Sequence, residues 1–397
     1  MKRKLLYILV ICVVFIGLTG CSDYEDLGNT YNSKTDYQYS YHRQGEHITM
    51  ADSGNGYYFL DSKKNIYYTD KSKMKPVLLD NRPDADYNSQ QENNSKTDNA
   101  YTTGGFLTFY NEKLYTLETG EIALVEGNSI KETARLIEMS KDGTDRKTIL
   151  TLDFPPTSIA IHRGIVYYAV RDYSKDADLE YYLMKYDLKK KFFNKPEVIY
   201  TGSLSQGGIQ DIIPYGNNVY FLETGKNLLR QMRYDIKNKT VTRIITDDDK
   251  LFPTITGFFN SKLVINIYDG DDNYEKKWIS YLSDLDGSNK KELPIDINFI
   301  SNIYSFGDYI FVRPVSSHLH AYEKYKHIPD EMVVYDSDYQ IVDKVDTSYY
   351  VGQHYLVSGD DEYMFVFYAK DGKHYIDYLD KKEIGSGKLK FKNLFKD

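Results

Sequence analysis

The chain has 397 residues, of which 58 are acidic and 50 are basic, and its formal net charge is −8. This charge argues against nucleic acid as a partner, because nucleic-acid-binding domains present a basic surface. The two cysteines, Cys12 and Cys21, both lie near the start, so a chain cut before Cys21 forms no internal disulfide. A chain of this length can be stabilised by its core alone.

Residues 1–20 predict a lipoprotein export signal. Lys2, Arg3 and Lys4 precede an apolar run over residues 5–18, which is shorter than the roughly 20 residues that a membrane-spanning helix needs. The residues Leu-Thr-Gly then stand directly before Cys21 and resemble the lipobox of bacterial lipoproteins. We expect cleavage before Cys21, a diacylglycerol on its thiol, and an extracytoplasmic location at the cell membrane. An uncleaved anchor and an ordinary signal peptide are the alternatives.

Residues 21–46 are expected to form the lipidated end and a flexible tether. The stretch 22–40 is polar and shows no hydrophobic period. Because the chain is acidic, we expect the acyl chains rather than charge to hold it at the membrane.

From residue 47 to residue 397 the chain repeats one four-part unit. A short apolar strand, a tight turn rich in Gly, Asn or Asp, and a tyrosine-rich strand are followed by a third and a fourth strand. The 40 tyrosines favour strands, because aromatic residues fit a pleated, half-buried surface. Seven copies of the second strand align, at residues 57–60, 114–117, 166–169, 219–222, 263–266, 309–312 and 363–366.

Four antiparallel strands that recur about every 50 residues predict an all-β fold, a β-propeller. A single sheet cannot cover its two apolar faces, whereas a ring of sheets buries both against neighbours. Seven four-stranded blades fit the alignment best, and the short strands leave six or eight open. A pair of β-sandwiches is the alternative architecture.

Short motifs connect the repeats with a known group of propellers. Residues 66–70 read IYYTD, one aromatic residue away from the YWTD repeat, and residues 140–145 and 284–289 read SKDGTD and DLDGSN, like the DG turn. On these motifs the chain resembles bacterial YWTD-like and TolB-like propellers, including lipoproteins that carry such a domain. The resemblance implies a binding or scaffolding role without a particular ligand.

Long insertions are expected to gather on one face. In a propeller, the connections from second to third strand and from fourth strand to the next blade emerge on the same face, here called the long-loop face. The insertions at residues 80–104, 118–133, 171–180, 268–277 and 313–330 all belong to these two classes. Varied loops on a rigid scaffold suit recognition, so we expect this face to be the working face, and idle insertions are the alternative. The candidate binding residues are Arg171, Asp172, Tyr173, His318, His320 and Tyr322.

Two loops carry groups that suit metals. Oxygen donors alternate as at the start of a calcium loop, although Tyr274 and Ser280 replace the Gly and Glu that an EF-hand requires. These donors are Asp269, Asp271, Asn273 and Glu275. Three histidines and a carboxylate offer ligands for a transition metal at His318, His320, Glu323 and His327. In both cases we expect a solvated polar loop, with a metal site as the alternative, and we expect no resident cofactor.

The sequence contains none of the common catalytic motifs. It has no G-x-S-x-G elbow, no H-E-x-x-H, no C-x-x-C and no Walker glycine loop. We therefore expect a lipid-anchored propeller that binds or scaffolds a protein or glycan at the cell envelope through its long-loop face. The alternative is a propeller-type glycan hydrolase or lyase, in which carboxylates converge with an Arg, His or Tyr at the channel mouth.

Overall fold

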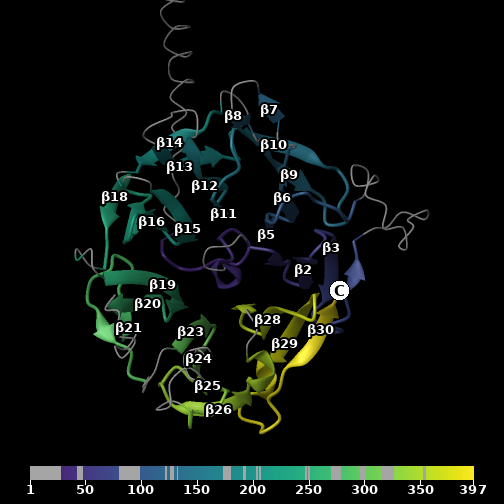
Figure 1. The fold of residues 1–397 in the computed structure, drawn as a ribbon, viewed down its shortest axis with the longest axis vertical. Coiled ribbons are helices and arrows are strands. Elements are labelled where there is room, and N and C mark those ends of the chain that lie inside the picture. Colours follow the sequence, from purple (N-terminus) through teal and green to yellow (C-terminus); the bar gives the residue numbers. More distant parts are fainter. Residues whose placement is uncertain are drawn as a thin grey trace, which may run out of the picture.

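The propeller consists of seven four-stranded antiparallel sheets, or blades, around a central channel (Figure 1). This architecture is seen in a computed structural model, and the predicted all-β propeller of seven blades is confirmed. The structure describes residues 28–42, 48–79, 99–120, 123–125, 129–131, 133–172, 180–190, 194–202, 204, 207–245, 248, 251–269, 279–295, 301–314, 326–351 and 355–397.

Within each blade the first strand lies next to the channel and the fourth lies at the outer rim (Figure 1). Blades 1 to 4 consist of β1 (Met50–Asp52), β2 (Gly56–Leu60), β3 (Ile66–Asp70) and β4 (Val77–Leu78); β5 (Leu107–Tyr110), β6 (Lys113–Thr119), β9 (Ala134–Met139) and β10 (Lys147–Leu152); β11 (Ser158–His162), β12 (Ile165–Asp172), β13 (Glu180–Asp187) and β14 (Glu197–Thr201); and β15 (Gly208–Tyr215), β16 (Asn218–Gly225), β17 (Leu228–Asp235) and β18 (Thr240–Arg243). Blades 5 to 7 consist of β19 (Leu251–Phe259), β20 (Lys262–Asp269), β21 (Ile279–Ser283) and β22 (Lys291–Glu292); β23 (Ser301–Phe306), β24 (Tyr309–Pro314), β25 (Glu331–Tyr335) and β26 (Ile341–Asp346); and β27 (Tyr355–Gly359), β28 (Tyr363–Lys370), β29 (Lys373–Asp380) and β30 (Lys392–Lys396). Blade 2 carries an extra hairpin of β7 (Ala123–Val125) and β8 (Ser129–Lys131) between its second and third strands.

Tight turns join the first and second strands, as their Gly, Asn and Asp residues predict. In blade 2 the turn residues Asn111 and Glu112 have φ of 47° and 63°, and in blade 3 Arg163 and Gly164 have φ of 52° and 86°. Two successive positive φ values match the twist of a two-residue hairpin. These turns lie on the face opposite the long-loop face, and we call it the turn face.

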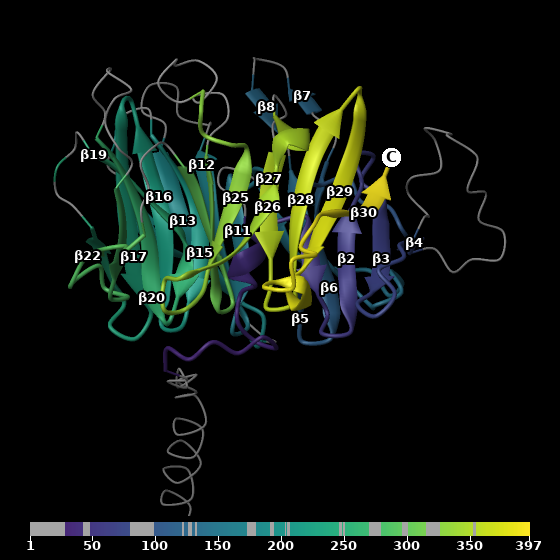
Figure 2. The same ribbon diagram turned by 90° about the horizontal axis from the view of Figure 1, so that it is seen from below.

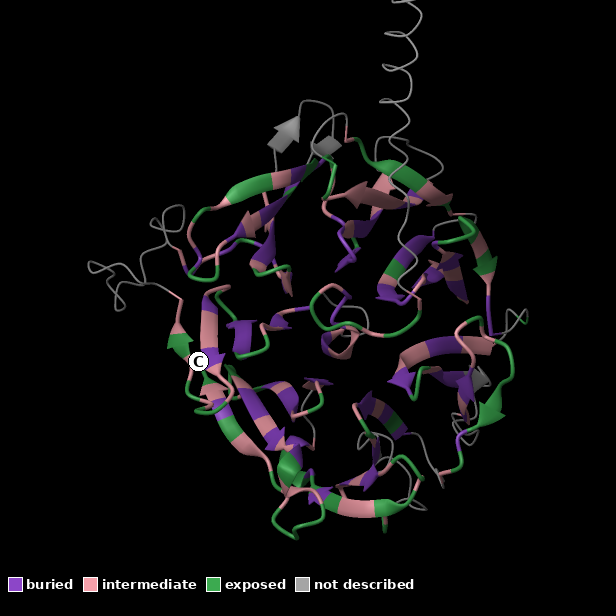
Figure 3. Ribbon diagram, turned by 180° about the vertical axis from the view of Figure 1, so that it is seen from behind, coloured by how far each residue is buried: buried purple, intermediate pink, exposed green. Residues whose placement is uncertain are grey.

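The second strands carry the core between blades. Val219 and Phe221 of β16 are fully buried, and in β20 the consecutive residues Leu263 and Val264 enter two different hydrophobic clusters, each shared with a different neighbour. Both faces of a middle strand are therefore covered, as a ring of sheets requires. Figure 3 shows that exposed residues concentrate on the outer strands and turns.

Blades 1 and 7 close the ring without exchanging a strand, since each is built from one continuous piece of chain. The ring of Phe395 packs 5.3 Å from that of Phe59, measured between centroids. Asp360, in the turn between β27 and β28, accepts hydrogen bonds from Tyr57 Oη at 2.7 Å and from Lys71 Nζ at 3.3 Å. Closure thus rests on side-chain contacts.

Residues 28–42, here called the N-terminal segment, differ from the expected tether. The segment runs from the turn face into the channel (Figures 1 and 2) and ends near the 3-10 turn η1 (Tyr39–Tyr41). Tyr37 and Tyr41 are each 2% exposed and belong to the largest hydrophobic cluster of the ring. The segment lacks a hydrophobic period because it contacts several blades in turn rather than one face of a sheet. The tether interpretation is therefore corrected for residues 28–42, and the rest of the stretch 21–46 lies outside the described residues.

Helical structure in the described residues is limited to short 3-10 turns. Besides η1 these are η3 (Ser348–Tyr350) and η4 (Lys381–Glu383), each of three residues. The described part of the chain contains no helix with the length and apolarity needed to cross a membrane.

Candidate binding site in the central channel

A buried ion pair fixes the N-terminal segment to the ring. Arg163, in the turn between β11 and β12, donates from Nε to Asp36 Oδ1 at 2.8 Å and from Nη2 to Asp36 Oδ2 at 3.1 Å. The same guanidinium donates to the carbonyl oxygens of Gly28 and Thr30 and to the side-chain oxygen of Asn217. Arg163 is 6% exposed and Asp36 is 4% exposed. Such a bidentate, desolvated pair specifies one geometry.

His162 binds the backbone of the same segment. Its Nδ1 accepts the N–H of Tyr37 at 3.0 Å, and its Nε2 donates to the carbonyl oxygen of Gly216 at 2.8 Å. Burial lowers the pKa of His162 from 6.5 to about 4, so the imidazole is neutral with its proton on Nε2. Protonation would place a second N–H against the N–H of Tyr37.

We expect the free energy of unfolding to fall as the pH drops from 6.5 toward 4. In this range the unfolded chain binds a proton at His162 that the folded chain does not, and the difference amounts to about 2 kcal/mol between pH 7 and pH 5. Urea unfolding at a series of pH values measures it. His162→Asn retains an acceptor for the Tyr37 N–H without a titrating ring, so it should flatten the profile. If the free energy of unfolding depends on pH equally in the native protein and in the variant, the assignment of this pH dependence to His162 is wrong.

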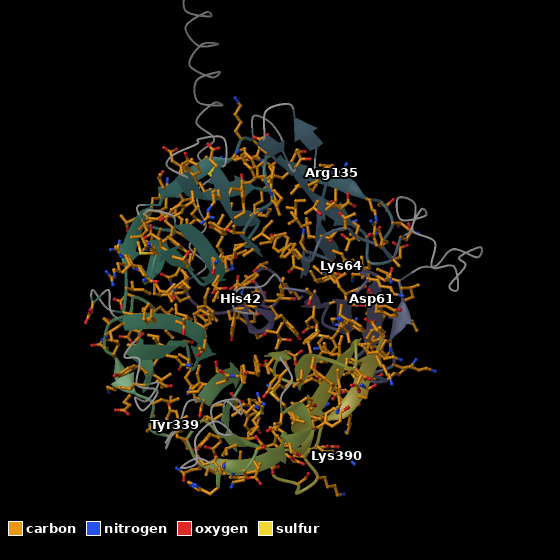
Figure 4. All side chains as sticks on the ribbon, in the orientation of Figure 1. His42, Asp61, Lys64, Arg135, Tyr339 and Lys390 are labelled. Carbon is orange, nitrogen blue, oxygen red and sulfur yellow. The ribbon has the colours of Figure 1, made fainter. Side chains whose placement is uncertain are left out.

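Beside the N-terminal segment the channel holds a chamber of about 310 Å³. One wall is the segment itself, with Tyr39, Ser40 and His42, and Figure 4 shows His42 near the centre of the ring. The other walls come mainly from the inner strands of blades 4 to 7, with Leu222, Gln231 and Asn266 from the second and third strands of blades 4 and 5. Their lining side chains include Asp211, Thr256, Phe258, Asn302, Ser305 and Tyr355.

The chamber extends to the long-loop end of the channel. The inner strands run from the long-loop face to the turn face, because each one ends in a tight turn there. Tyr355 is the first residue of β27 and Asn302 is the second of β23, so both stand at the long-loop end. The N-terminal segment occupies the other end, where it contacts the turns that contain Arg163 and Asp360. Among the described residues, the N-terminal segment therefore occupies the turn-face end of the channel, and the chamber lies toward the long-loop end.

Two β-bulges shape the chamber wall. In β15 the pairing with β16 is irregular around Asp211, whose φ is 50°, and this residue faces the chamber. In β19 the register shifts between Ile255 and Gly257, and all residues from 254 to 258 line the chamber. A regular strand would present every second residue, whereas a bulge re-aims side chains.

A chain of hydrogen bonds links the segment to the wall. His42 Nε2 lies 3.3 Å from Asp211 Oδ1, and His42 Nδ1 lies 3.0 Å from Tyr37 Oη. Because a carboxylate only accepts, Nε2 donates to Asp211, and in the neutral imidazole Nδ1 accepts from the Tyr37 hydroxyl. Burial, and then Asp211, raise the pKa of Tyr37, which keeps it a donor. Both ring nitrogens of His42 are thus engaged within the protein.

Two hydroxyls of the chamber wall have no hydrogen-bond partner within the described residues. Ser305 is 3% exposed. Its Oγ packs so closely against Gly257 that a Cβ added to this glycine would lie 2.4 Å from the oxygen. The hydroxyl of Tyr355 is also buried, and the Arg313 guanidinium stacks 3.8 Å from the centre of its ring. A buried hydroxyl without a partner costs about 1–3 kcal/mol, so each one is a point at which a bound molecule could supply a hydrogen bond.

Most site residues predicted from the sequence lie outside the described residues. These are Cys21, Tyr173, Asp271, Asn273, Glu275, His318, His320, Tyr322 and Glu323. Arg171 and Asp172 end β12 at the long-loop face, where Arg171 donates to the carbonyl oxygen of Gly207 in the connection to blade 4. Asp269 ends β20 and His327 precedes β25. The described residues contain no cluster of three or more His, Cys, Asp or Glu arranged to hold a metal.

The residues of the channel were missed by sequence reasoning. The available signal for the N-terminal segment was the alternation of Tyr37, Tyr39 and Tyr41, because a solvated tether contains few aromatic residues. Asp211 gave no comparable signal, since the bulge that aims it depends on pairing with β16.

Comparisons in sequence found no relative: no protein-family model matches the chain, and no curated protein matches it. Solved structures are similar in fold. Prolyl oligopeptidase B from Galerina marginata matches with a TM-score of 0.56 at 9% identity, covering 90% of this chain and 51% of that chain. Oligogalacturonate lyase from Vibrio parahaemolyticus matches with a TM-score of 0.51 at 13% identity, covering 88% and 92%.

TolB from Acinetobacter baumannii matches with a TM-score of 0.40 at 13% identity, covering 87% of this chain and 78% of that chain. The chain spans about half the length of the peptidases that it matches. At such identities the likeness to the oligopeptidase and the lyase shows the propeller fold alone.

Proposed function

We propose that the protein is a lipid-anchored binding protein of the cell envelope, which recognises a protein or glycan through its long-loop face and the channel behind it. The observation that carries the proposal is the position of the chamber, which lies toward one end of the channel. The N-terminal segment fills the turn-face end, and the chamber extends to the long-loop end at Asn302 and Tyr355. A rigid scaffold with loops around a hollow is a common form of binding site.

The position of the N-terminal segment supports the orientation of this face. Gly28 lies at the turn face, where its carbonyl oxygen accepts a hydrogen bond from Arg163. Only six residues lie between Gly28 and the proposed lipidation site Cys21, and the seven residue-to-residue steps span at most about 25 Å in an extended chain. A lipid on Cys21 would therefore hold the turn face toward the membrane and direct the long-loop face away from it.

The chemistry of the chamber supports binding over hydrolysis. Among the described residues that line it, Asp211 is the one carboxylate, and it accepts a hydrogen bond from His42. Glycan hydrolysis uses two carboxylates at a set separation. Both ring nitrogens of His42 are engaged within the protein, so among the described lining residues this imidazole offers no free nitrogen to a ligand.

Replacement of His318, His320 and Tyr322 by alanine should reduce partner capture. The free energy of unfolding should change by no more than about 0.5 kcal/mol if these residues lie in a loop, as the sequence predicts, because loop positions contribute little to folding. Capture is measured by chemical crosslinking on intact cells, followed by identification of the crosslinked species.

The matched control is the double variant Glu112→Ala and Lys141→Ala, which removes an exposed ion pair on the turn face. Cys21→Ala, which should abolish uptake of labelled fatty acid, reports on the anchor in the same cells. If the turn-face variant loses capture and the loop variant retains it, the proposed working face is wrong.

A further inference from the structure

We propose that the chamber binds a neutral, hydroxyl-rich ligand of the saccharide class. This inference rests on the proposed binding function and names the chemical class of one ligand. The volume of about 310 Å³ lies at the lower end of the range for small-molecule pockets, roughly 300–1,000 Å³. It suits a mono- or disaccharide rather than a longer chain.

The charge of the lining favours a neutral molecule. Among the described residues that line the chamber there is no Lys or Arg, and the single carboxylate, Asp211, is held by His42. No Lys or Arg of the described lining would pair with an acidic sugar, and an unpaired charge is costly in a desolvated site. The net negative charge of the whole chain also disfavours an acidic ligand.

The unpartnered hydroxyls favour a ligand that forms hydrogen bonds. Ser305 Oγ and Tyr355 Oη are buried in or beside the chamber without a partner among the described residues. A sugar hydroxyl is both donor and acceptor, so it can satisfy either group and replace the hydrogen bonds of the water that it displaces. A quaternary ammonium ion would also fit an aromatic chamber, but it offers no hydrogen bond and would leave both hydroxyls unsatisfied.

Aromatic and amide side chains of the chamber add apolar and polar contacts that suit a sugar. Tyr355 contributes a ring on which the C–H face of a sugar can pack, while Asn302 and Thr256 offer further polar contacts. The Tyr355 ring is held in place by the stacked guanidinium of Arg313, so this contact is formed before a ligand arrives. A few placed polar groups among apolar ones are typical of specific small-ligand sites.

Calorimetric titration of the detergent-solubilised full-length protein tests the inference. The probes are two neutral disaccharides, chitobiose and cellobiose, together with digalacturonate and choline. We expect a neutral disaccharide to bind, and Ser305→Ala and Tyr355→Phe each to weaken its binding about tenfold, which corresponds to one lost hydrogen bond. Neither variant should lower the melting temperature, because each removes a hydroxyl that has no partner in the described fold.

Ser358→Ala is the matched control. Its hydroxyl is buried and unpartnered in the same way among the described residues, but Ser358 does not line the chamber, so the affinity should not change. Failure of both disaccharides to bind, binding that both chamber variants leave unchanged, or tighter binding of digalacturonate or choline would each overturn the inference. If the disaccharides fail while intact cells still yield a partner lost in the loop variant, the saccharide inference falls and the proposed function stands.

Discussion

Arg163→Ala is expected to lower the free energy of unfolding by about 3–5 kcal/mol, the range for breaking a buried ion pair. The substitution leaves the Asp36 carboxylate, which is 4% exposed, without its cation. It also removes the donors to the carbonyl oxygens of Gly28 and Thr30. Urea unfolding measures the loss, and limited proteolysis should show cleavage within the N-terminal segment before the rest of the ring.

The double variant Asp36→Leu with Arg163→Met provides the control for this prediction. It replaces both charges by apolar groups, so it should recover much of the stability that either truncation loses. A loss below about 1 kcal/mol for Arg163→Ala would mean that the N-terminal segment adds little to the ring, and that its place in the channel is set by other contacts.

Asp360→Ala is expected to destabilise the closed ring by about 3–5 kcal/mol. The carboxylate accepts hydrogen bonds from Tyr41 Oη at 2.8 Å and Tyr57 Oη at 2.7 Å and pairs with Lys71, so three groups from blade 1 and the N-terminal segment lose one acceptor together. Despite its burial the pKa of Asp360 lies below its ordinary value, because Lys71 and the hydrogen bonds stabilise the charged form. Thermal unfolding with the transition followed by tyrosine fluorescence checks the prediction.

Two further variants sharpen this test. Asp360→Asn keeps the shape and one acceptor oxygen but removes the charge that faces Lys71, so it should lose less stability than alanine. Asp338→Ala changes an acidic residue in an exposed turn and should shift stability by no more than about 0.5 kcal/mol. Equal effects of the alanine substitutions at positions 360 and 338 would show that Asp360 does not hold the seam.

The repeat and the fold could be predicted because their signals are local. The second strand at residues 219–222 is a short apolar run after a turn, and the same pattern recurs in each blade. Its burial between two neighbours follows from the pattern itself, since the apolar residues need cover on both faces. The blade number followed from counting these copies, and the sheets confirm seven.

The candidate site could not be predicted because its contacts are not local. Asp36 pairs with a residue 127 positions later, and Asp211 faces the chamber through a bulge that depends on the neighbouring strand. Polar composition led to the tether interpretation for residues 22–40, because a polar stretch without a period is typical of solvated linkers. The partners that bury Asp36 stand in a turn of blade 3, which the composition of the segment does not reveal.

The contacts of the N-terminal segment also impose an order on the folding of the chain. Tyr41 is made early, but its acceptor Asp360 follows 319 residues later, in the last blade. The segment can bind blades 3 and 4 once they exist, yet it cannot complete its contacts until blade 7 has been synthesised. A short loop closes quickly, whereas a contact across nearly the whole chain must wait for the intervening residues to be arranged. Docking of the N-terminal segment is therefore complete only when the last blade has formed, and in an unfinished chain Tyr41 would lack its acceptor and stay accessible to chaperones and proteases.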